Sequence, residues 1–288
     1  MTSLREVMKH AEADHVAIGH FNFSDLVAFN AIVAAARDRK LPVLVGVSEG
    51  EREFIGVAEA AALVRAIRDE YDYPIFLNAD HTHSIAKAEE AAKAGFDEII
   101  FDGSALPFEE NIAQTKKAIE AIKSINPAIM VEGEIGWIGA SSAVLDKVPE
   151  GVGVLTTPAE AKQFVEATKV DVLAPAVGNM HGMLTSMVHG DVQKRLHIER
   201  IAEIKAAAGI FMTLHGGSGT NDDDFKRAIK AGMTIVHVNT ELRIAWRNGI
   251  EAALAAHPNE VAPYKILPAA VDAVEKVVSS RLELFNSK

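Results

Sequence analysis

The sequence predicts an α/β protein of the (β/α)8, or TIM-barrel, class with an extra helix at its C-terminal end. Short apolar runs alternate eight times with longer helix-like segments along the chain. The chain has 288 residues, which suits one such barrel, and 49% of them are hydrophobic, which is enough for a large core. No linker-like stretch divides the chain, so we expect a single domain over residues 1–288.

The expected barrel strands are eight runs rich in Val, Ile, Leu and Phe, as is typical of strands covered on both faces. They span residues 16–21, 43–47, 75–79, 98–101, 128–132, 171–174, 210–214 and 234–238. A doubly wound sheet can use the same units, but eight strand–helix pairs are the number that a closed barrel requires.

The expected helices lie between these runs, and several have recognisable capping residues. They span residues 24–39, 56–71, 84–94, 107–124, 158–168, 197–208, 221–231 and 240–256. The expected N-caps are Ser24, Ser84 and Asn221, and the expected C-terminal caps are Gly95, Gly209 and Gly232. A last amphipathic helix, at about 267–285, is expected to pack outside the barrel. The long stretch 133–157 interrupts the pattern and is expected to be a lid or binding loop.

Composition excludes several classes of function. A net charge of −11 and a pI near 5.5 argue against binding to nucleic acid or to an anionic membrane. Cysteine is absent, which excludes disulfides and thiolate catalysis. The N-terminal residues resemble a charged helix rather than a signal peptide, and no run of 18 apolar residues occurs, so we expect a cytoplasmic protein.

Polar side chains follow every predicted strand. In a barrel of this class, catalytic groups lie at the C-terminal ends of the strands. The polar residues at these positions are Asn22, Ser48, Glu49, Asp80, His81, His83, Asp102, Glu132, Glu134, His181, His215, Asn239 and Thr240.

Three of these residues, His81, His181 and His215, are candidate metal ligands. Three neutral imidazoles favour Zn²⁺ and leave a coordination position open for a substrate. Asp80 adjoins the first histidine and is a candidate acid/base. His83 is expected to cap the helix that follows it rather than to bind the metal.

Glycine-rich turns provide a second signal, for a phosphate site. The segment HGGSG at 215–219 follows a predicted strand and precedes a predicted helix. Its backbone N–H groups and the Ser218 hydroxyl can bind a phosphate, and Asn239 and Thr240 begin the next helix. Loops after the seventh and eighth strands form phosphate sites in many barrels of this class.

Lysine is scarce at the predicted catalytic face. A Schiff-base mechanism needs a lysine there. Lys147, in the long loop, is the only candidate that we identify from the sequence. The sequence therefore favours a metal over an iminium as the electrophile.

With these residues in place, the chain resembles the class II, metal-dependent fructose-bisphosphate and tagatose-bisphosphate aldolases over nearly its whole length. The segments that carry the resemblance are NADHTHS, AAKAGFDEIIFDGS, VEGEIGWIG, DVLAPAVGNMHG, LHGGSG and AIKAGMTIVHVNTELR. The resemblance implies a (β/α)8 barrel, a homodimer or homotetramer, and the cleavage of a ketose bisphosphate, with fructose 1,6-bisphosphate as the first expectation.

The resemblance also assigns roles to individual residues. It implies that His81, His181 and His215 bind a catalytic zinc ion and that Asp80 moves the proton of the C4 hydroxyl. Glu134, with Asp102 nearby, matches a second or alternative metal site. The residues matched to substrate and phosphate contacts are Asn22, Ser48, Gly182, Gly216, Ser218, Asn239 and Thr240. Arg281 matches an arginine that reaches a phosphate across a subunit interface, and a monovalent cation is expected near the phosphate site.

Two segments depart from the family pattern and keep alternatives open. The long loop has GASSAV at 139–144 in place of an acidic segment, and His237 stands where the family has Asn. The alternatives are an aldolase for tagatose 1,6-bisphosphate or another ketose phosphate, and a catalytically weak barrel that binds sugar phosphates. A metal hydrolase, suggested by the pair His81 and His83, is disfavoured because the pair follows the third strand instead of the first.

Overall fold

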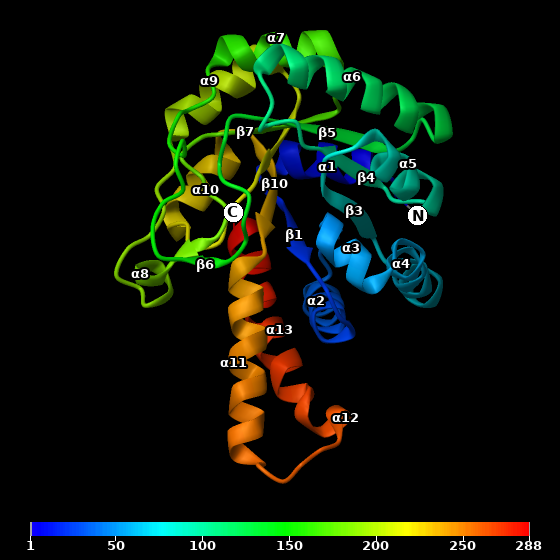
Figure 1. Cartoon of the computed structure of the whole chain (residues 1–288), viewed down its shortest axis with the longest axis vertical. Coiled ribbons are helices and arrows are strands. Elements are labelled where there is room, and N and C mark those ends of the chain that lie inside the picture. Colours follow the sequence, from blue (N-terminus) through cyan, green and yellow to red (C-terminus); the bar gives the residue numbers. More distant parts are fainter. Residues whose placement is uncertain (1, 288) are drawn as a thin grey trace.

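The computed structural model describes residues 2–287 and confirms the predicted (β/α)8 barrel (Figure 1). Eight parallel strands close in the order β1-β10-β9-β7-β5-β4-β3-β2. They are β1 (Ile18–Asn22), β2 (Val43–Val47), β3 (Ile75–Thr82), β4 (Glu98–Phe101), β5 (Met130–Ile135), β7 (Val172–Pro175), β9 (Phe211–Leu214) and β10 (Met233–Val238). Because all eight are parallel, their C-terminal ends meet at one mouth of the barrel.

Helices follow the strands and cover the outside of the barrel. They are α2 (Leu26–Arg39), α3 (Glu49–Ile55), α4 (Val57–Tyr71), α5 (Ile85–Ala94), α6 (Phe108–Ile125), α7 (Pro158–Thr168), α9 (Ile198–Ala208), α10 (Asp222–Lys230) and α11 (Thr240–Ala256). Their apolar faces and the outward faces of the strands form the larger buried cluster. Among the described residues, no helix combines the length and apolar character needed to cross a bilayer.

Helix α1 (Leu4–Asp14) closes the end of the barrel opposite the mouth. Its Ser3 cap and capping box fix the first turn, and its Leu4 and Met8 pack with inward-facing strand residues such as Leu44 and Phe76. The mouth is therefore the end of the barrel that is left for a site.

The structure corrects several predicted boundaries. Asp25, not Ser24, caps α2, since its side chain accepts the N–H of Ala28. Ala231, not Gly232, is the C-cap of α10. Strand β3 continues to Thr82, and the short helix α3 was not predicted. The helix expected at 267–285 is confirmed as α13 (Pro268–Phe285).

The long stretch 133–157 is only partly a loop. Strand β5 extends into it as far as Ile135, and β6 (Val144–Leu145) pairs in parallel with β8 (Met183–Leu184), which precedes the short helix α8 (Thr185–Val188). This small sheet places the loop 139–145 over the mouth of the barrel.

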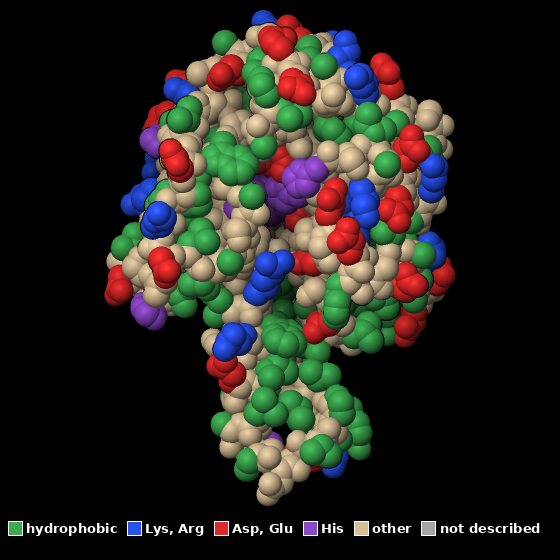
Figure 2. All heavy atoms as spheres, in the orientation of Figure 1, with side chains coloured by type: hydrophobic (Ala, Val, Ile, Leu, Met, Phe, Trp, Pro, Cys, Tyr) green, Lys and Arg blue, Asp and Glu red, His purple; other side chains and the backbone are tan. Residues whose placement is uncertain are grey.

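Helices α11 and α13 form an arm that extends away from the barrel, with the short helix α12 (Pro263–Ile266) at its tip (Figure 1). The end of α13 returns to the barrel, where Ala17 donates its N–H to the carbonyl of Phe285. Figure 2 shows hydrophobic side chains gathered along the arm.

Candidate metal centre and active site

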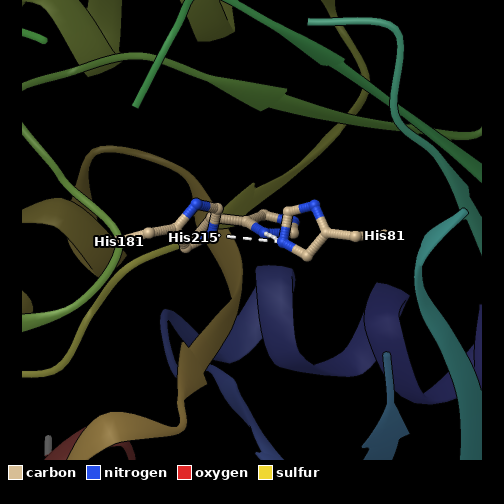
Figure 3. Close-up of side chains that lie close together, drawn as sticks. All are labelled: His81, His181 and His215. Carbon is tan, nitrogen blue, oxygen red and sulfur yellow. Dashed lines mark hydrogen bonds between the residues drawn. The ribbon is translucent and has the colours of Figure 1, made fainter. Parts of the chain in front are cut away.

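His81, His181 and His215 converge at the mouth of the barrel (Figure 3). The Nε2 atom of His81 lies 3.1 Å from Nε2 of His181 and 3.2 Å from Nδ1 of His215. Ligands of a tetrahedral zinc ion at about 2.0–2.1 Å lie about 3.3 Å from one another. The three nitrogens therefore have the spacing of a divalent metal site.

A local irregularity turns His81 toward the mouth. The pairing of β3 with β4 shifts register between Ala79 and Thr82, and His81 has a positive φ of 39°. A bulge of this kind re-aims a side chain out of the alternating pattern of a strand. Asp80 and His81 can for this reason both face the site although they are neighbours in one strand.

The second ring nitrogen of each histidine also has a partner. His81 Nδ1 lies 2.8 Å from Asp102 Oδ2, His215 Nε2 lies 2.6 Å from Glu132 Oε1, and His181 Nδ1 donates to the carbonyl of Gly139 at 2.6 Å. Such partners fix the tautomer and orientation of metal-binding imidazoles. The Glu132 carboxylate also accepts the hydroxyl of Thr213, which holds it in place.

The protonation states suit a metal site. Burial lowers the pKa of both His181 and His215 to about 3, so both rings are neutral at pH 7 and can donate a lone pair. Burial also acts to lower the pKa of His81, but Asp80, Asp102 and Glu134 raise it well above its usual value. A metal ion would replace the proton of His81 in the same negative field.

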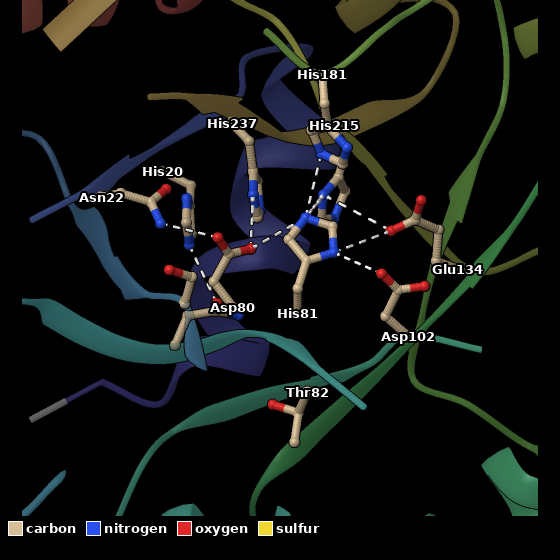
Figure 4. A network of polar contacts seen from close by, with 12 residues as sticks. His20, Asn22, Asp80, His81, Thr82, Asp102, Glu134, His181, His215 and His237 are labelled. Atoms are coloured by element: carbon tan, nitrogen blue, oxygen red, sulfur yellow. Dashed lines mark hydrogen bonds and ion pairs between the residues drawn. The ribbon is translucent and has the colours of Figure 1, made fainter. Parts of the chain in front are cut away.

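Asp80 lies beside the histidine rings (Figure 4), and one of its carboxylate oxygens accepts no hydrogen bond. Its Oδ2 accepts the Asn22 side-chain N–H at 2.8 Å, whereas its buried Oδ1 has no hydrogen bond and lies 3.7 Å from His81 Nε2. Burial acts to raise the pKa of Asp80, but the charge of His81 and the hydrogen bond from Asn22 act against it, and the net pKa is lowered. Asp80 is therefore an ionised base with a free lone pair.

Glu134 and Asp102 form a second possible metal group with His81. Glu134 Oε2 lies 3.5 Å from His81 Nδ1 and has no hydrogen-bond partner. Burial, and then the charge of Asp102, raise the pKa of Glu134 well above its usual value. These residues are close enough to hold a metal in an alternative position, on the far side of the His81 ring.

The residues expected to bind phosphate also come together. Gly182, Gly216, Ser218, Asn239 and Thr240 line a small cavity next to Asp80 and the histidines. Gly182 and Gly216 have φ angles of 75° and 60°, a region that favours glycine, and a Cβ at Gly182 would lie 2.6 Å from the carbonyl oxygen of Ala143. Among residues 2–287, the N–H groups of Gly182 and Ser218 have no acceptor, and α11 directs its N-terminus toward the same cavity.

A larger cavity of about 470 Å³ leads from the metal centre to solvent, and Figure 2 shows histidine side chains within this hollow. Ser48 lines it, and its N–H is bound by Glu51, which also accepts the side chain of Asn22. Trp137 and the loop 139–142 form the opposite wall. The cavity is large enough for a six-carbon sugar phosphate.

One expectation differs from the structure at this site, and two other residues considered in the sequence lie outside both cavities. His83 does not cap α5: Ser84 does, while the His83 ring contacts the carbonyl of Asp102. Arg281 does not line either cavity of its own chain, where Glu241 and Asp222 bind its guanidinium, and its contact with a phosphate of a second subunit stays a prediction. Lys147 is exposed and also outside both cavities.

Other residues of the site were missed in the sequence. Glu132 was noted only as a polar strand end and not as the partner of His215. His20 and His237 stack face to face at a centroid distance of 3.4 Å behind Asp80, an arrangement that only the β1–β10 register reveals. Lys194 is buried directly beneath the glycine turns, although it has no motif around it. Arg243, one turn into α11, reaches the larger cavity.

The fold and the site are those of a (β/α)8-barrel protein with a group of histidines at its mouth that could hold a metal ion. The chain belongs to the class II fructose-bisphosphate aldolase family: the family model described as "Fructose-bisphosphate aldolase class-II" matches residues 2–288. This finding confirms the resemblance seen in the motifs.

Individual relatives agree with this assignment. The chain is 34% identical to a probable fructose-bisphosphate aldolase of Bacillus subtilis, in an alignment that covers 100% of this chain and 98% of that protein. It is 32% identical to the fructose-bisphosphate aldolase of Geobacillus stearothermophilus, over 100% and 97% of the two chains. The YdjI aldolase from Escherichia coli K12 superposes with a TM-score of 0.83 at 26% identity, covering 99% of this chain and 97% of the other.

Proposed function

We propose that this protein is a zinc-dependent aldolase that reversibly cleaves fructose 1,6-bisphosphate into dihydroxyacetone phosphate and glyceraldehyde 3-phosphate. The observation that carries the proposal is the ionised Asp80 with its unpaired oxygen beside three converging imidazoles. The names of the relatives favour the fructose over the tagatose substrate. We take the chain to be one catalytic domain and to act in the cytoplasm.

Asp80 is the base in this mechanism. Its Oδ1 removes the proton of the C4 hydroxyl, the C4–O bond becomes the carbonyl of glyceraldehyde 3-phosphate, and the C3–C4 bond breaks. The electron pair of that bond moves toward the C2 carbonyl, which gives the enediolate of dihydroxyacetone phosphate. Asn22 orients Asp80 through the hydrogen bond to Oδ2.

A divalent ion held by His81, His181 and His215 supplies a Lewis acid for the charge that develops on the substrate. Zn²⁺ is preferred because the donor set is three neutral imidazoles. Asp102, Glu132 and the Gly139 carbonyl keep the three rings in their ligand tautomers. Glu134 with Asp102 is the alternative position for the ion.

The phosphate of the dihydroxyacetone half is assigned to the cavity lined by Gly182, Gly216, Ser218, Asn239 and Thr240. Backbone N–H groups and the start of a 17-residue helix favour an anion there. Asn22 lines this cavity and Ser48 lines the larger one, where they can contact the sugar hydroxyls. A phosphate fixed at this end holds the C3–C4 bond next to Asp80.

We also propose that the protein is a homodimer or homotetramer. The arm formed by α11, α12 and α13 exposes apolar side chains, among them Val261 and Tyr264 with 86% and 75% of their surfaces accessible. A groove next to the arm is lined by Phe54, Leu242 and Trp246. Such surfaces on a protein of this size favour contact with a second copy.

The reaction is tested with a coupled cleavage assay on fructose and tagatose bisphosphates and on the corresponding monophosphates. We expect EDTA to abolish cleavage, added Zn²⁺ to restore it, and borohydride with substrate to cause no inactivation. Trapping of the substrate on a lysine by borohydride would refute the metal mechanism. Binding of sugar phosphates without cleavage in the presence of Zn²⁺ would instead identify a non-catalytic binding protein.

A further inference from the structure

Lys194 lies in the segment between α8 and α9, and its ammonium group is enclosed by backbone carbonyl oxygens. The side chain is 4% exposed. Its Nζ lies 2.6 Å from the carbonyl oxygens of Met180, Gly182 and Ser218 and 3.0 Å from that of Gly216. An ammonium group has three N–H bonds, so it cannot donate a separate hydrogen bond to each of four oxygens. The four carbonyl oxygens therefore surround its charge in the way that they would surround a bare monovalent cation.

The four carbonyls belong to the two turns that form the expected phosphate cavity. Met180 and Gly182 flank His181, and Gly216 and Ser218 belong to the turn that follows His215. The Lys194 backbone is itself fixed, because its N–H donates to Gly219 and its carbonyl accepts from Asn221. The ammonium therefore joins two turns that are separated by more than thirty positions in the chain.

The charge of Lys194 has no carboxylate partner within ion-pair distance among the described residues. Glu241 is the acidic residue whose field reaches it, but the Glu241 carboxylate is bound by Arg281 at 2.8 and 3.0 Å and by the N–H of Gly219. A buried charge without a counter-ion is costly. An anion in the cavity above the two turns would supply the missing negative charge.

We propose that Lys194 is the built-in cation of the phosphate site and takes the place of a free monovalent cation. The carbonyl oxygens of the two turns point inward to the ammonium, so that the N–H groups of Gly182 and Ser218 are left for the phosphate. This inference rests on the proposed location of the phosphate. A monovalent cation was expected near the phosphate site, and Lys194 takes its role. Lys194 is then a positioning residue rather than a catalytic one.

The test measures binding of glycerol 3-phosphate, a phosphate monoester without the reacting ketone, to the zinc-loaded protein by calorimetry. The wild-type dissociation constant is expected to be the same in about 0.1 M tetramethylammonium chloride as in KCl or NH₄Cl at equal ionic strength. Lys194→Ala is expected to weaken binding about ten- to a hundredfold in tetramethylammonium chloride. K⁺ or NH₄⁺, which fit the emptied carbonyl cage, are expected to restore much of the affinity.

Two further variants control this test. Lys194→Met fills the cage with an uncharged chain, so it should lose affinity and gain nothing from K⁺. Lys123→Ala removes another partly buried lysine, which lies on α6 away from the mouth and binds a backbone carbonyl and Asp171; this variant should leave binding unchanged.

A wild-type protein that needs K⁺ to bind glycerol 3-phosphate would overturn the proposal. This measurement uses only the wild-type protein, so it does not depend on the folding of a variant. Unchanged affinity in Lys194→Ala, or lost affinity that neither K⁺ nor NH₄⁺ improves, would overturn it as well. Cation-independent binding without any cleavage of bisphosphates would contradict the proposed reaction but not the role of Lys194.

Discussion

Asp80 has two carboxylate oxygens with different tasks. Oδ2 accepts the hydrogen bond of Asn22, and Oδ1 is buried without a partner. Asp80→Asn keeps the size and the contact with Asn22 but removes the base, so turnover should fall by about 10²–10⁴-fold. Zinc content, measured by atomic absorption, should stay the same because Asp80 is not among the three converging histidines that we propose as ligands. Turnover at the wild-type rate would remove Asp80 from its role.

Glu132 is predicted to act on the metal through His215. Its Oε1 lies 2.6 Å from His215 Nε2, and both side chains are fully buried. Glu132→Gln weakens this orienting contact and should reduce zinc affinity by about 10–100-fold, measured by competition with a chelator.

Glu98→Gln is the matched control for that variant. Glu98 is another buried carboxyl group inside the barrel, but it is bound to Asn78 rather than to a ring. Zinc affinity should therefore be unchanged in this variant. An equal loss of affinity in both variants would show that barrel packing, and not the Glu132–His215 contact, is responsible.

At the level of single residues, the sequence reveals candidate ligands better than it reveals their partners. His81, His181 and His215 are identifiable because histidines at strand ends in one fold must share one mouth. The contact of Glu132 with His215 depends on which inward positions are level with one another across the barrel. Lys194 gives no signal of its own, because its role depends on the carbonyl directions of two distant turns.

At the level of elements, α1 is tied to the closed end of the barrel through Asp171. The carboxylate of Asp171 pairs with Arg5 of α1, with Lys123 of α6 at 2.8 Å and with the N–H of Val131 at 2.9 Å. Burial acts to raise the pKa of Asp171, but these partners outweigh it and the net pKa is lowered. The folded state therefore favours the ionised carboxylate.

Asp171→Asn should cost about 2 kcal/mol of unfolding free energy at pH 7, as expected for charged hydrogen bonds lost from a partly buried site. Because the folded pKa is depressed, this stability is present above the unfolded pKa of about 3.9 and is lost as pH falls through the folded value. In urea unfolding of the metal-free proteins, the difference in unfolding free energy between the wild type and this variant should disappear below about pH 4. Asp69→Asn, at an exposed position on α4, should have the same unfolding free energy as the wild type at every pH.

The helix and strand patterns predict most elements because period and capping are local properties. Helices α7 and α11 and strands β2 and β4 match their expected bounds, and Ser84 and Asn221 cap as expected. The errors have tertiary causes. The bulge at His81 extends β3 beyond its apolar run, and β6 forms only because β8 from a distant segment lies beside it.

At the level of the whole molecule, the closed barrel and the position of its mouth follow from the count of strand–helix units, which the sequence contains. The arm is different, since α13 was expected but its projection from the barrel with α11 was not (Figure 1). An isolated chain gains little from exposing Val261 and Tyr264 at the tip, where 86% and 75% of their surfaces are accessible to solvent. Surfaces of this kind are stabilised when a partner removes them from water.

If the protein is the homo-oligomer that we propose, the double variant Val261→Asp and Tyr264→Asp is therefore expected to convert it into a monomer. Two charges on the tip must lose their water if the contact forms, which costs several kcal/mol per buried ion and exceeds the apolar gain of the two side chains. Sedimentation velocity at micromolar concentration measures the change. Val154→Asp provides the matched control, because Val154 is 73% exposed but lies in the loop before α7, so this variant should keep the wild-type sedimentation coefficient. A monomeric wild-type protein, or a double variant that sediments like the wild type, would contradict an interface at the arm.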